Sequence, residues 1–235
     1  MMTKRLMVRG LTLALTLNLL IVLLLCNIEA VAFDVEHYRG QFAHLDRPGA
    51  TGMSQEELVR VTGEIWSYLR GQRGNLQLTA LVDGQRLPVF DQREQDHMVD
   101  VRVLFQRGYF LRNVGLVLLP ILLITAVLLN NNHRLDRGLA LILNRAGMGS
   151  LFILLAVGIL VYYSFDSWFD RFHLLFFPND LWQLDPSRHN LIKMFPLDFF
   201  FNTTIKFVGR SLLQLAIITA GSGWYLVWKR GKGSR

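Results

Sequence analysis

This sequence has few charged residues and a single cysteine. Only 18% of the 235 residues are charged, against roughly 25% in soluble domains. Hydrophobic residues make up 51%, and the mean hydropathy is +0.30. This composition excludes a disordered chain and argues against an ordinary soluble one. The single cysteine, Cys26, excludes an intrachain disulfide and a cysteine-based metal site. The sequence also lacks a Walker loop, a G-x-S-x-G elbow and an H-E-x-x-H zinc motif.

Four apolar runs are long enough to cross a bilayer as helices, because a hydrocarbon core of roughly 30 Å needs about 20 residues. They cover residues 10–28, 113–133, 146–165 and 211–228. We therefore expect a mainly α, polytopic membrane protein with a four-transmembrane-helix bundle. The first run also resembles a signal peptide, since Ala30-Val31-Ala32 follows it like a cleavage site. It is longer than the usual apolar region of roughly 7–15 residues, so we interpret it as a retained anchor.

The distribution of charge predicts how the spans are oriented. Ten basic residues and only one acid, Asp136, lie at the two termini and between the second and third runs: Lys4, Arg5, Arg9, Arg134, Arg137, Arg145, Lys229, Arg230, Lys232 and Arg235. By the positive-inside rule, we expect both termini and the middle loop to face the cytoplasm. The formal net charge of +7 is then an orientation signal and not a sign of nucleic-acid binding.

The runs divide the chain into five parts. We expect the first transmembrane helix in 1–30, an extracytoplasmic cap in 31–107 and the second and third transmembrane helices in 108–165. An extracytoplasmic segment rich in aromatic residues follows in 166–200. The fourth transmembrane helix and a basic cytoplasmic tail occupy 201–235.

The cap has recognisable local signals. Ser54 and Glu57 have the spacing of a helix-capping box, and the helix they begin should end at Gly71. Asp83-Gly84 lies between two apolar stretches, which predicts a short β-hairpin with a tight turn. A further helix should begin near Glu94 and lead to the second span.

Two of the six histidines lie where outward helices meet the membrane. His97 has Glu94 and Asp100 three residues to either side, and His173 has Asp170 and Asp166 at three and seven residues before it. A carboxylate one helical turn away can fix the tautomer of an imidazole and raise its basicity, as a general base requires. The alternatives are two ordinary interfacial histidines, or a metal site made with Asp100, Asp166 or Asp170, for which no tight ligand spacing exists. We expect the remaining histidines to face solvent: His37, His44, His133 at the cytoplasmic edge with Arg134, and His189.

Two short stretches carry a resemblance to a known family. Residues 94–102, from Glu94 to Arg102, resemble an E-x-x-H-M-x-D-V-K/R signature. Residues 172–177, followed by Trp182, Asp185 and Phe195-Pro196, resemble a second signature. The sequence is thereby similar to the bacterial lipoprotein intramolecular transacylases, the Lit enzymes. The similarity covers nearly the whole chain. Arg102 stands where lysine is commoner, and Asn179-Asp180 replaces a turn that often contains glycine.

The resemblance implies a reaction and the residues that perform it. Such an enzyme moves the sn-2 acyl chain of a diacylglyceryl lipoprotein to the α-amine of its N-terminal cysteine, giving a lyso-form lipoprotein. His97 and His173 would be the catalytic pair, with no cofactor and no metal. The candidate supporting residues are Glu94, Asp100, Arg102, Asp170, Phe172, Phe176 and Trp182.

The chemistry fits these residues independently of the resemblance. An amine that attacks an ester needs a base, and the departing glyceryl oxygen needs an acid, and two imidazoles can supply both. No protein nucleophile is required, since amine and ester belong to one substrate molecule held in proximity. An aromatic chamber at the bilayer surface would hold the acyl chains and exclude water. The alternatives are a membrane lipid or ester hydrolase using the same histidines, and a non-enzymatic assembly or sensor protein.

This mechanism makes a geometric prediction. Because the second and third spans should run antiparallel, their outer ends should be neighbours. We expect the two imidazoles at the outer face, within about 10 Å of each other and facing one aromatic-lined cavity. We also expect residues 94–107 to lie along the membrane, joined to the second span by a bend near Gly108.

Overall fold

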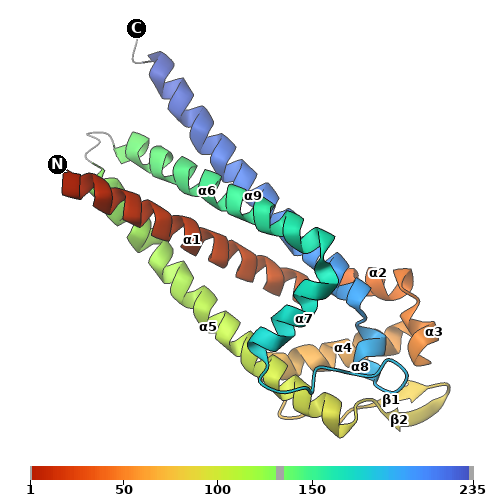
Figure 1. Cartoon of the computed structure of the whole chain (residues 1–235). Coiled ribbons are helices and arrows are strands. Elements are labelled where there is room, and N and C mark those ends of the chain that lie inside the picture. Colours follow the sequence, from red (N-terminus) through yellow and green to blue (C-terminus); the bar gives the residue numbers. More distant parts are fainter. Residues whose placement is uncertain (1, 131–134, 233–235) are drawn as a thin grey trace. The chain divides into compact units, whose positions relative to one another are not determined.

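A computed structural model describes residues 2–130 and 135–232 of the chain (Figure 1). The predictions that concern His133, Arg134 and Arg235 lie outside these residues. Four described helices are long and apolar enough to cross a membrane: α1 (Met2–Ala32), α5 (Gln92–Leu129), α6 (Leu135–Tyr163) and α9 (Leu197–Lys232). The expected mainly α fold with four spans is confirmed. The chain divides into two compact units, each described separately below.

The first unit is a helical bundle. It comprises the described residues of Met1–Ile28, Phe110–Tyr163 and Lys206–Arg235, so its helices are α1, α6 and the apolar parts of α5 and α9, which lie side by side (Figure 1). Leu15, Ile142 and Leu215 are completely or almost completely buried in its core. Helix packing in lipid depends on close contact and on polar side chains that bond across helices, and this bundle has both.

Close approach and interhelical hydrogen bonds fix these helices. A Cβ on Gly115 of α5 would lie 2.5 Å from Cγ2 of Val22 on α1, so only glycine fits at this crossing. Beside it, Nδ2 of Asn18 donates to the Gly115 carbonyl at 3.0 Å. Elsewhere Oγ of Ser150 on α6 donates to the Thr16 carbonyl at 2.8 Å, and Nδ2 of Asn144 donates to the Thr219 carbonyl of α9 at 2.8 Å.

The second unit comprises Glu29–Tyr109 and Ser164–Ile205. It contains α2 (Val35–His44), α3 (Arg47–Thr51), α4 (Gln55–Leu69), α7 (Phe165–Phe176) and α8 (Asn190–Met194), together with the first turns of α5 and α9. Side chains from several of these helices form one core, which includes the fully buried residues Phe42, Leu58, Val61 and Met194.

The local signals of the cap behave as predicted. Oγ of Ser54 accepts the N–H of Glu57 at 3.2 Å and so caps α4, which ends before Gly71 at φ 79°. The strands β1 (Thr79–Val82) and β2 (Gln85–Pro88) pair antiparallel. Asp83 and Gly84 both have positive φ, 48° and 80°, which is the conformation of a two-residue type I′ turn. The predicted hairpin is confirmed.

The bend expected near Gly108 stays a prediction, because Gly108 lies within one continuous helix. Residues Gln92–Leu129 form one α-helix of 38 residues that continues through Gly108. Glycine in a helix interior costs only about 1 kcal/mol relative to alanine, and no proline or capping residue adjoins Gly108 to end the helix there. A helical break occurs at Ser164, between α6 and α7.

Candidate active site

The two motif histidines lie side by side in the second unit, on different helices. His97 is in the second turn of α5 and His173 is in the last turn of α7. Their ring centroids are 6.3 Å apart, and the rings are inclined at 36°. Only 6% of His97 and 8% of His173 is exposed. The prediction that the imidazoles lie within about 10 Å of each other is confirmed.

Aromatic rings surround the pair. Phe177 contacts both imidazoles, with centroid distances of 5.2 Å to His97 and 5.5 Å to His173. Trp182 stacks on His173 at 4.7 Å with an interplanar angle of 26°. Phe169 and Phe172 contact His173 at 4.3 and 5.4 Å. Of the candidate supporting aromatics, Phe172 and Trp182 therefore touch a histidine.

Phe176 lies one step further away and is half exposed. Its ring packs on Phe172 at 4.9 Å. Phe176 therefore contacts the aromatic residues around the histidines and not the histidines themselves.

One hydrogen bond fixes the tautomer of His173. Its Nδ1 lies 2.7 Å from the backbone carbonyl oxygen of Phe169, one turn earlier in α7. A carbonyl oxygen can only accept, so Nδ1 carries the proton and Nε2 carries the lone pair. Burial lowers the pKa of His173, while the bond to Phe169 and the charge of Asp170 act in the opposite direction. His173 is therefore a neutral imidazole with an open basic nitrogen.

His97 is the more strongly desolvated member of the pair. Burial, with a contribution from neighbouring His173, lowers the pKa of His97 to about 4, and Asp100 only partly offsets this. Two imidazolium ions 6.3 Å apart would repel by about 3 kcal/mol at an effective dielectric constant near 20. The pair therefore holds at most one proton near neutral pH. Nδ1 of His97 is buried and has no hydrogen-bond partner among the described residues.

The nearby acids have different surroundings. Asp100 accepts a hydrogen bond from Nδ2 of Asn179 at 2.8 Å, and it raises the pKa of His97 electrostatically. Glu94, only 2% exposed, accepts the N–H of Leu191 at 2.6 Å and the N–H of Asp91 at 2.8 Å. Its two oxygens thus bind backbone groups, and the structure gives them no bond to His97. Burial raises the pKa of Glu94 above its ordinary value.

Arg102 points to a different part of the second unit. Its guanidinium donates to the Arg73 carbonyl at 3.2 Å and lies 4.8 Å from the centre of the Tyr68 ring. It therefore stabilises the end of α4 and the following loop.

The prediction that the other histidines face solvent is wrong at two positions. His189 is 7% exposed, and its Nδ1 accepts the N–H of Asp185 at 2.7 Å while Nε2 lies 3.3 Å from Oδ2 of Asp91. His37 is 8% exposed, with Nε2 2.9 Å from Oγ1 of Thr203. Both are buried because long-range polar partners satisfy them. His44 is exposed, as predicted.

Sequence reasoning identified Trp182 but missed how residues 177–184, which we call the covering segment, are held beside the histidines. Two contacts fasten this covering segment to α5 on either side of His97. Arg93 bonds to the Asp180 carbonyl and lies 3.6 Å from Oδ2 of the same residue, and Asn179 bonds to Asp100. These pairs are about 80 residues apart in sequence, and no local pattern indicates them.

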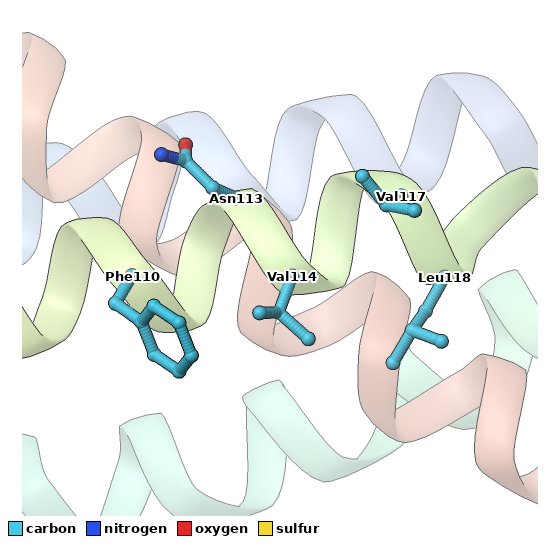
Figure 2. Close-up of a pocket in the computed structure, with 5 residues that line it drawn as sticks. All are labelled: Phe110, Asn113, Val114, Val117 and Leu118. Carbon is cyan, nitrogen blue, oxygen red and sulfur yellow. The ribbon is translucent and has the colours of Figure 1, made fainter.

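Metal-ligand clusters and cavities are the other features that could mark a site. Within 2–130 and 135–232, no three His, Cys, Asp or Glu side chains are grouped so that they could hold a metal ion. A cavity of about 330 Å³ in the first unit is lined by Phe110, Asn113, Val114, Val117 and Leu118, all on α5 (Figure 2). Figure 2 shows these side chains projecting from a single helix, and four of the five are apolar. Such a surface is typical of a lipid-facing helix.

Comparisons with known proteins agree with the described geometry. A family model described as "Lipoprotein intramolecular transacylase Lit" matches residues 13–200. The structure of the membrane integral lipoprotein intramolecular transacylase Lit from Bacillus cereus is 21% identical, with a TM-score of 0.78, covering 96% of this chain and 98% of that one. Two further structures of that protein, each with one histidine replaced, by arginine or by alanine, have TM-scores of 0.75 at 21% and 20% identity. They cover 97% and 96% of this chain and 95% and 96% of theirs. No curated protein sequence gives a significant match.

Proposed function

The chain belongs to the lipoprotein intramolecular transacylase family, and from that premise we propose that it performs its acyl transfer at the His97–His173 pair. It is a membrane-integral acyltransferase, and its function is lipoprotein intramolecular transacylation. The observation that carries the site assignment is the buried imidazole pair itself, 6.3 Å between centroids, with a basic Nε2 on His173 and an unpartnered Nδ1 on His97 among the described residues.

The proposed substrate is a lipoprotein whose N-terminal cysteine carries a diacylglyceryl group and a free α-amine. The amine nitrogen attacks the carbonyl carbon of the sn-2 ester, and the new bond is the amide C–N bond. The bond that breaks joins the same carbon to the glyceryl oxygen. The product is a lyso-form lipoprotein with a free sn-2 hydroxyl, and no atom is gained or lost.

His173 is suited to act as the base. Its Nε2 accepts the proton that the amine loses during attack, because Nδ1 is already protonated and bonded to Phe169. The resulting imidazolium is stabilised by the Phe169 carbonyl and by Asp170. When the intermediate collapses, Nε2–H returns this proton to the departing glyceryl oxygen.

His97 has a different role in this scheme. It stays neutral throughout, since its pKa is about 4 and a charged His173 disfavours a second proton. As a neutral donor, Nδ1–H hydrogen-bonds the glyceryl oxygen while negative charge develops there. This would satisfy a buried nitrogen that lacks a partner among the described residues.

The aromatic surroundings favour transfer over hydrolysis. Phe169, Phe172, Phe177 and Trp182 contact the ring of His173 and give the base an aromatic environment. An apolar enclosure strengthens electrostatic interactions within it and keeps competing water out. The amine of the same substrate molecule is then the favoured nucleophile.

The proposed topology places both termini in the cytoplasm and the histidines at the outer face of the membrane. It rests on the ten basic residues and single acid of the proposed cytoplasmic segments. A reporter fused after Arg235 should be active only in the cytoplasm, and activity only outside the cell would contradict the topology. Membrane lipid would surround the spans and contact the acyl chains of the substrate.

Tandem mass spectrometry tests the reaction. Purified protein is incubated in lipid nanodiscs with a diacylglyceryl lipopeptide whose sn-2 chain carries an isotopic label. Transacylation leaves the mass unchanged but places the label on an N-terminal amide fragment. A hydrolase would release labelled fatty acid, and a non-enzymatic protein would leave the peptide unaltered. Either result would contradict the proposal. His44→Gln, which changes an exposed histidine of the same unit, is the control for substitutions in the pair.

A further inference from the structure

Transacylation creates a charge that neither histidine is placed to stabilise. Attack on the ester converts the carbonyl oxygen into an oxyanion, and enzymes of this kind supply a fixed hydrogen-bond donor for it. In the proposed scheme His173 serves the amine and His97 serves the glyceryl oxygen. A third polar group is required.

Trp182 carries a buried donor without a partner. Its indole Nε1 is inaccessible to solvent and forms no hydrogen bond with any residue in 2–130 or 135–232. Buried tryptophan normally finds an acceptor for this N–H, because a buried donor left unpaired costs about 1–3 kcal/mol. A substrate oxygen would satisfy it.

The position of Trp182 matches this need. Its ring stacks on His173 at 4.7 Å between centroids and 26° between planes. The indole ring therefore lies directly against the ring of the base that initiates attack. The carbonyl carbon under attack must also lie close to Nε2 of His173, so its oxygen is within the region that the indole can reach.

The covering segment holds the indole in place before substrate binds. Asn179 is bonded to Asp100, and Asp180 is paired with Arg93, both on α5. Within the segment, the N–H of Gln183 donates to the Asp180 carbonyl at 3.0 Å and the N–H of Leu181 donates to Oδ1 of Asn179 at 3.1 Å. A donor fixed in this way needs no reorganisation when the oxyanion forms.

We infer that Trp182 is a catalytic residue whose indole Nε1–H donates a hydrogen bond to the oxyanion of the tetrahedral intermediate. The indole keeps its proton throughout, and the bond strengthens as the carbonyl oxygen becomes negative. The inference rests on the proposed transacylation at His97 and His173.

Replacement of the N–H alone gives the sharpest test. 3-Benzothienylalanine has nearly the shape of tryptophan but carries sulfur in place of N–H. At position 182 it should preserve the stacking on His173 and lower kcat by about 100-fold, with KM unchanged. The matched control is the same replacement at Trp168 on α7, which is 38% exposed and should leave kcat unaltered.

A second series protects the test against misfolding. Tryptophan with one, two or three ring fluorines at position 182 has a progressively stronger N–H donor, so kcat should rise along the series. Ring fluorines weaken the attraction of the indole face for the protonated His173 ring, so a role through ring contact alone predicts the opposite trend. A flat or falling series, or a benzothienyl variant with wild-type kcat or with changed KM alone, overturns the inference. If the wild-type protein yields free fatty acid, the proposed function fails instead.

Discussion

His189, His97 and His173 are almost equally buried in the same unit, with 7%, 6% and 8% of each residue exposed. The hydrogen bonding of their ring nitrogens differs. His189 has a partner on each side, the N–H of Asp185 and the carboxylate of Asp91. In the pair, His173 has one fixed nitrogen, and Nδ1 of His97 lacks a partner among the described residues.

This difference separates a structural histidine from a reactive one. A buried polar atom that is fully paired stabilises the fold and has nothing left to offer a substrate. A buried nitrogen without a partner carries a free-energy cost that a hydrogen bond to bound substrate would offset. Burial by itself is the same at both places, so burial alone does not identify the site.

The largest expected effect is the loss of activity when the open nitrogens are removed. His173→Gln and His97→Gln should each lower kcat by about 10²–10⁴-fold, the usual contribution of a positioned acid or base. Nδ1 of His97 has no partner to lose among the described residues, and the bond from Nδ1 of His173 runs to a carbonyl of its own helix, so thermal stability at pH 8 should change little. Turnover of the labelled lipopeptide and the unfolding midpoint measure the two effects.

His189→Gln is the matched variant on the other side of the comparison. It should lower the unfolding midpoint while the folded enzyme keeps a wild-type kcat, since His189 binds Asp91 and Asp185 and not substrate. A fall in kcat equal to that of His173→Gln would remove the distinction between the two kinds of buried histidine.

Glu94 should show the next largest effect, and on stability alone. Glu94→Ala leaves the buried N–H of Leu191 and the partly buried N–H of Asp91 without acceptors, at about 1–3 kcal/mol each. We expect the free energy of unfolding to fall by about 4 kcal/mol in a denaturant titration in micelles. Glu56→Ala, at an exposed position of α4, should cost less than about 1 kcal/mol. An equal loss in both variants would contradict the structural role of Glu94.

How much the sequence predicts depends on the range of the interactions. The spans follow from long apolar runs, the hairpin from Asp83-Gly84, and the start of α4 from Ser54, because each signal acts within a few residues. The closeness of His97 and His173 follows from the antiparallel second and third spans. The bend expected near Gly108 stays a prediction, since that glycine lies inside one continuous helix.

The polar partners of the second unit are beyond such reasoning. The spacing of Glu94 predicts a contact with His97, but its carboxylate binds the backbone of Leu191, 97 residues away. His189 is expected to be an exposed residue of a polar turn, but its ring nitrogens contact Asp91 and Asp185. Only the folded chain shows which polar groups are already paired.

The pH dependence of stability gives a smaller effect that sharpens the comparison. The pKa of His97 is about 4 when folded and about 6.5 when unfolded, so above pH 6.5 both states are neutral and the residue has no influence. As the pH falls from 6.5 to 4, the unfolded state binds the proton first and stability declines by about 3 kcal/mol in total. His173 acts in the same direction.

Unfolding titrations between pH 8 and pH 4 measure this decline. In His97→Gln the loss of stability in acid should be smaller by about the same 3 kcal/mol, since the titrating group is absent. If the free energy of unfolding fell by the same amount in acid in that variant as in the wild type, His97 would not be held neutral by burial.

The smallest effect concerns the pair of Arg93 and Asp180, which fastens the covering segment beside His97. Asp180 is largely exposed, so a double-mutant cycle of Arg93→Gln and Asp180→Asn should give a coupling energy below about 1 kcal/mol. Arg93 also lowers the pKa of His97, whereas Asp180 is not among the charges that shift it. In Arg93→Gln the folded-state pKa of His97 should rise toward 6.5. The loss of stability on acidification should therefore be slightly smaller and should end at a slightly higher pH. Asp180→Asn removes only the ion pair and keeps the bond from Arg93 to the Asp180 carbonyl, so it should leave the acid-induced loss of stability unchanged. If both variants changed the acid-induced loss of stability equally, the change would come from loosening of the covering segment and not from the charge of Arg93.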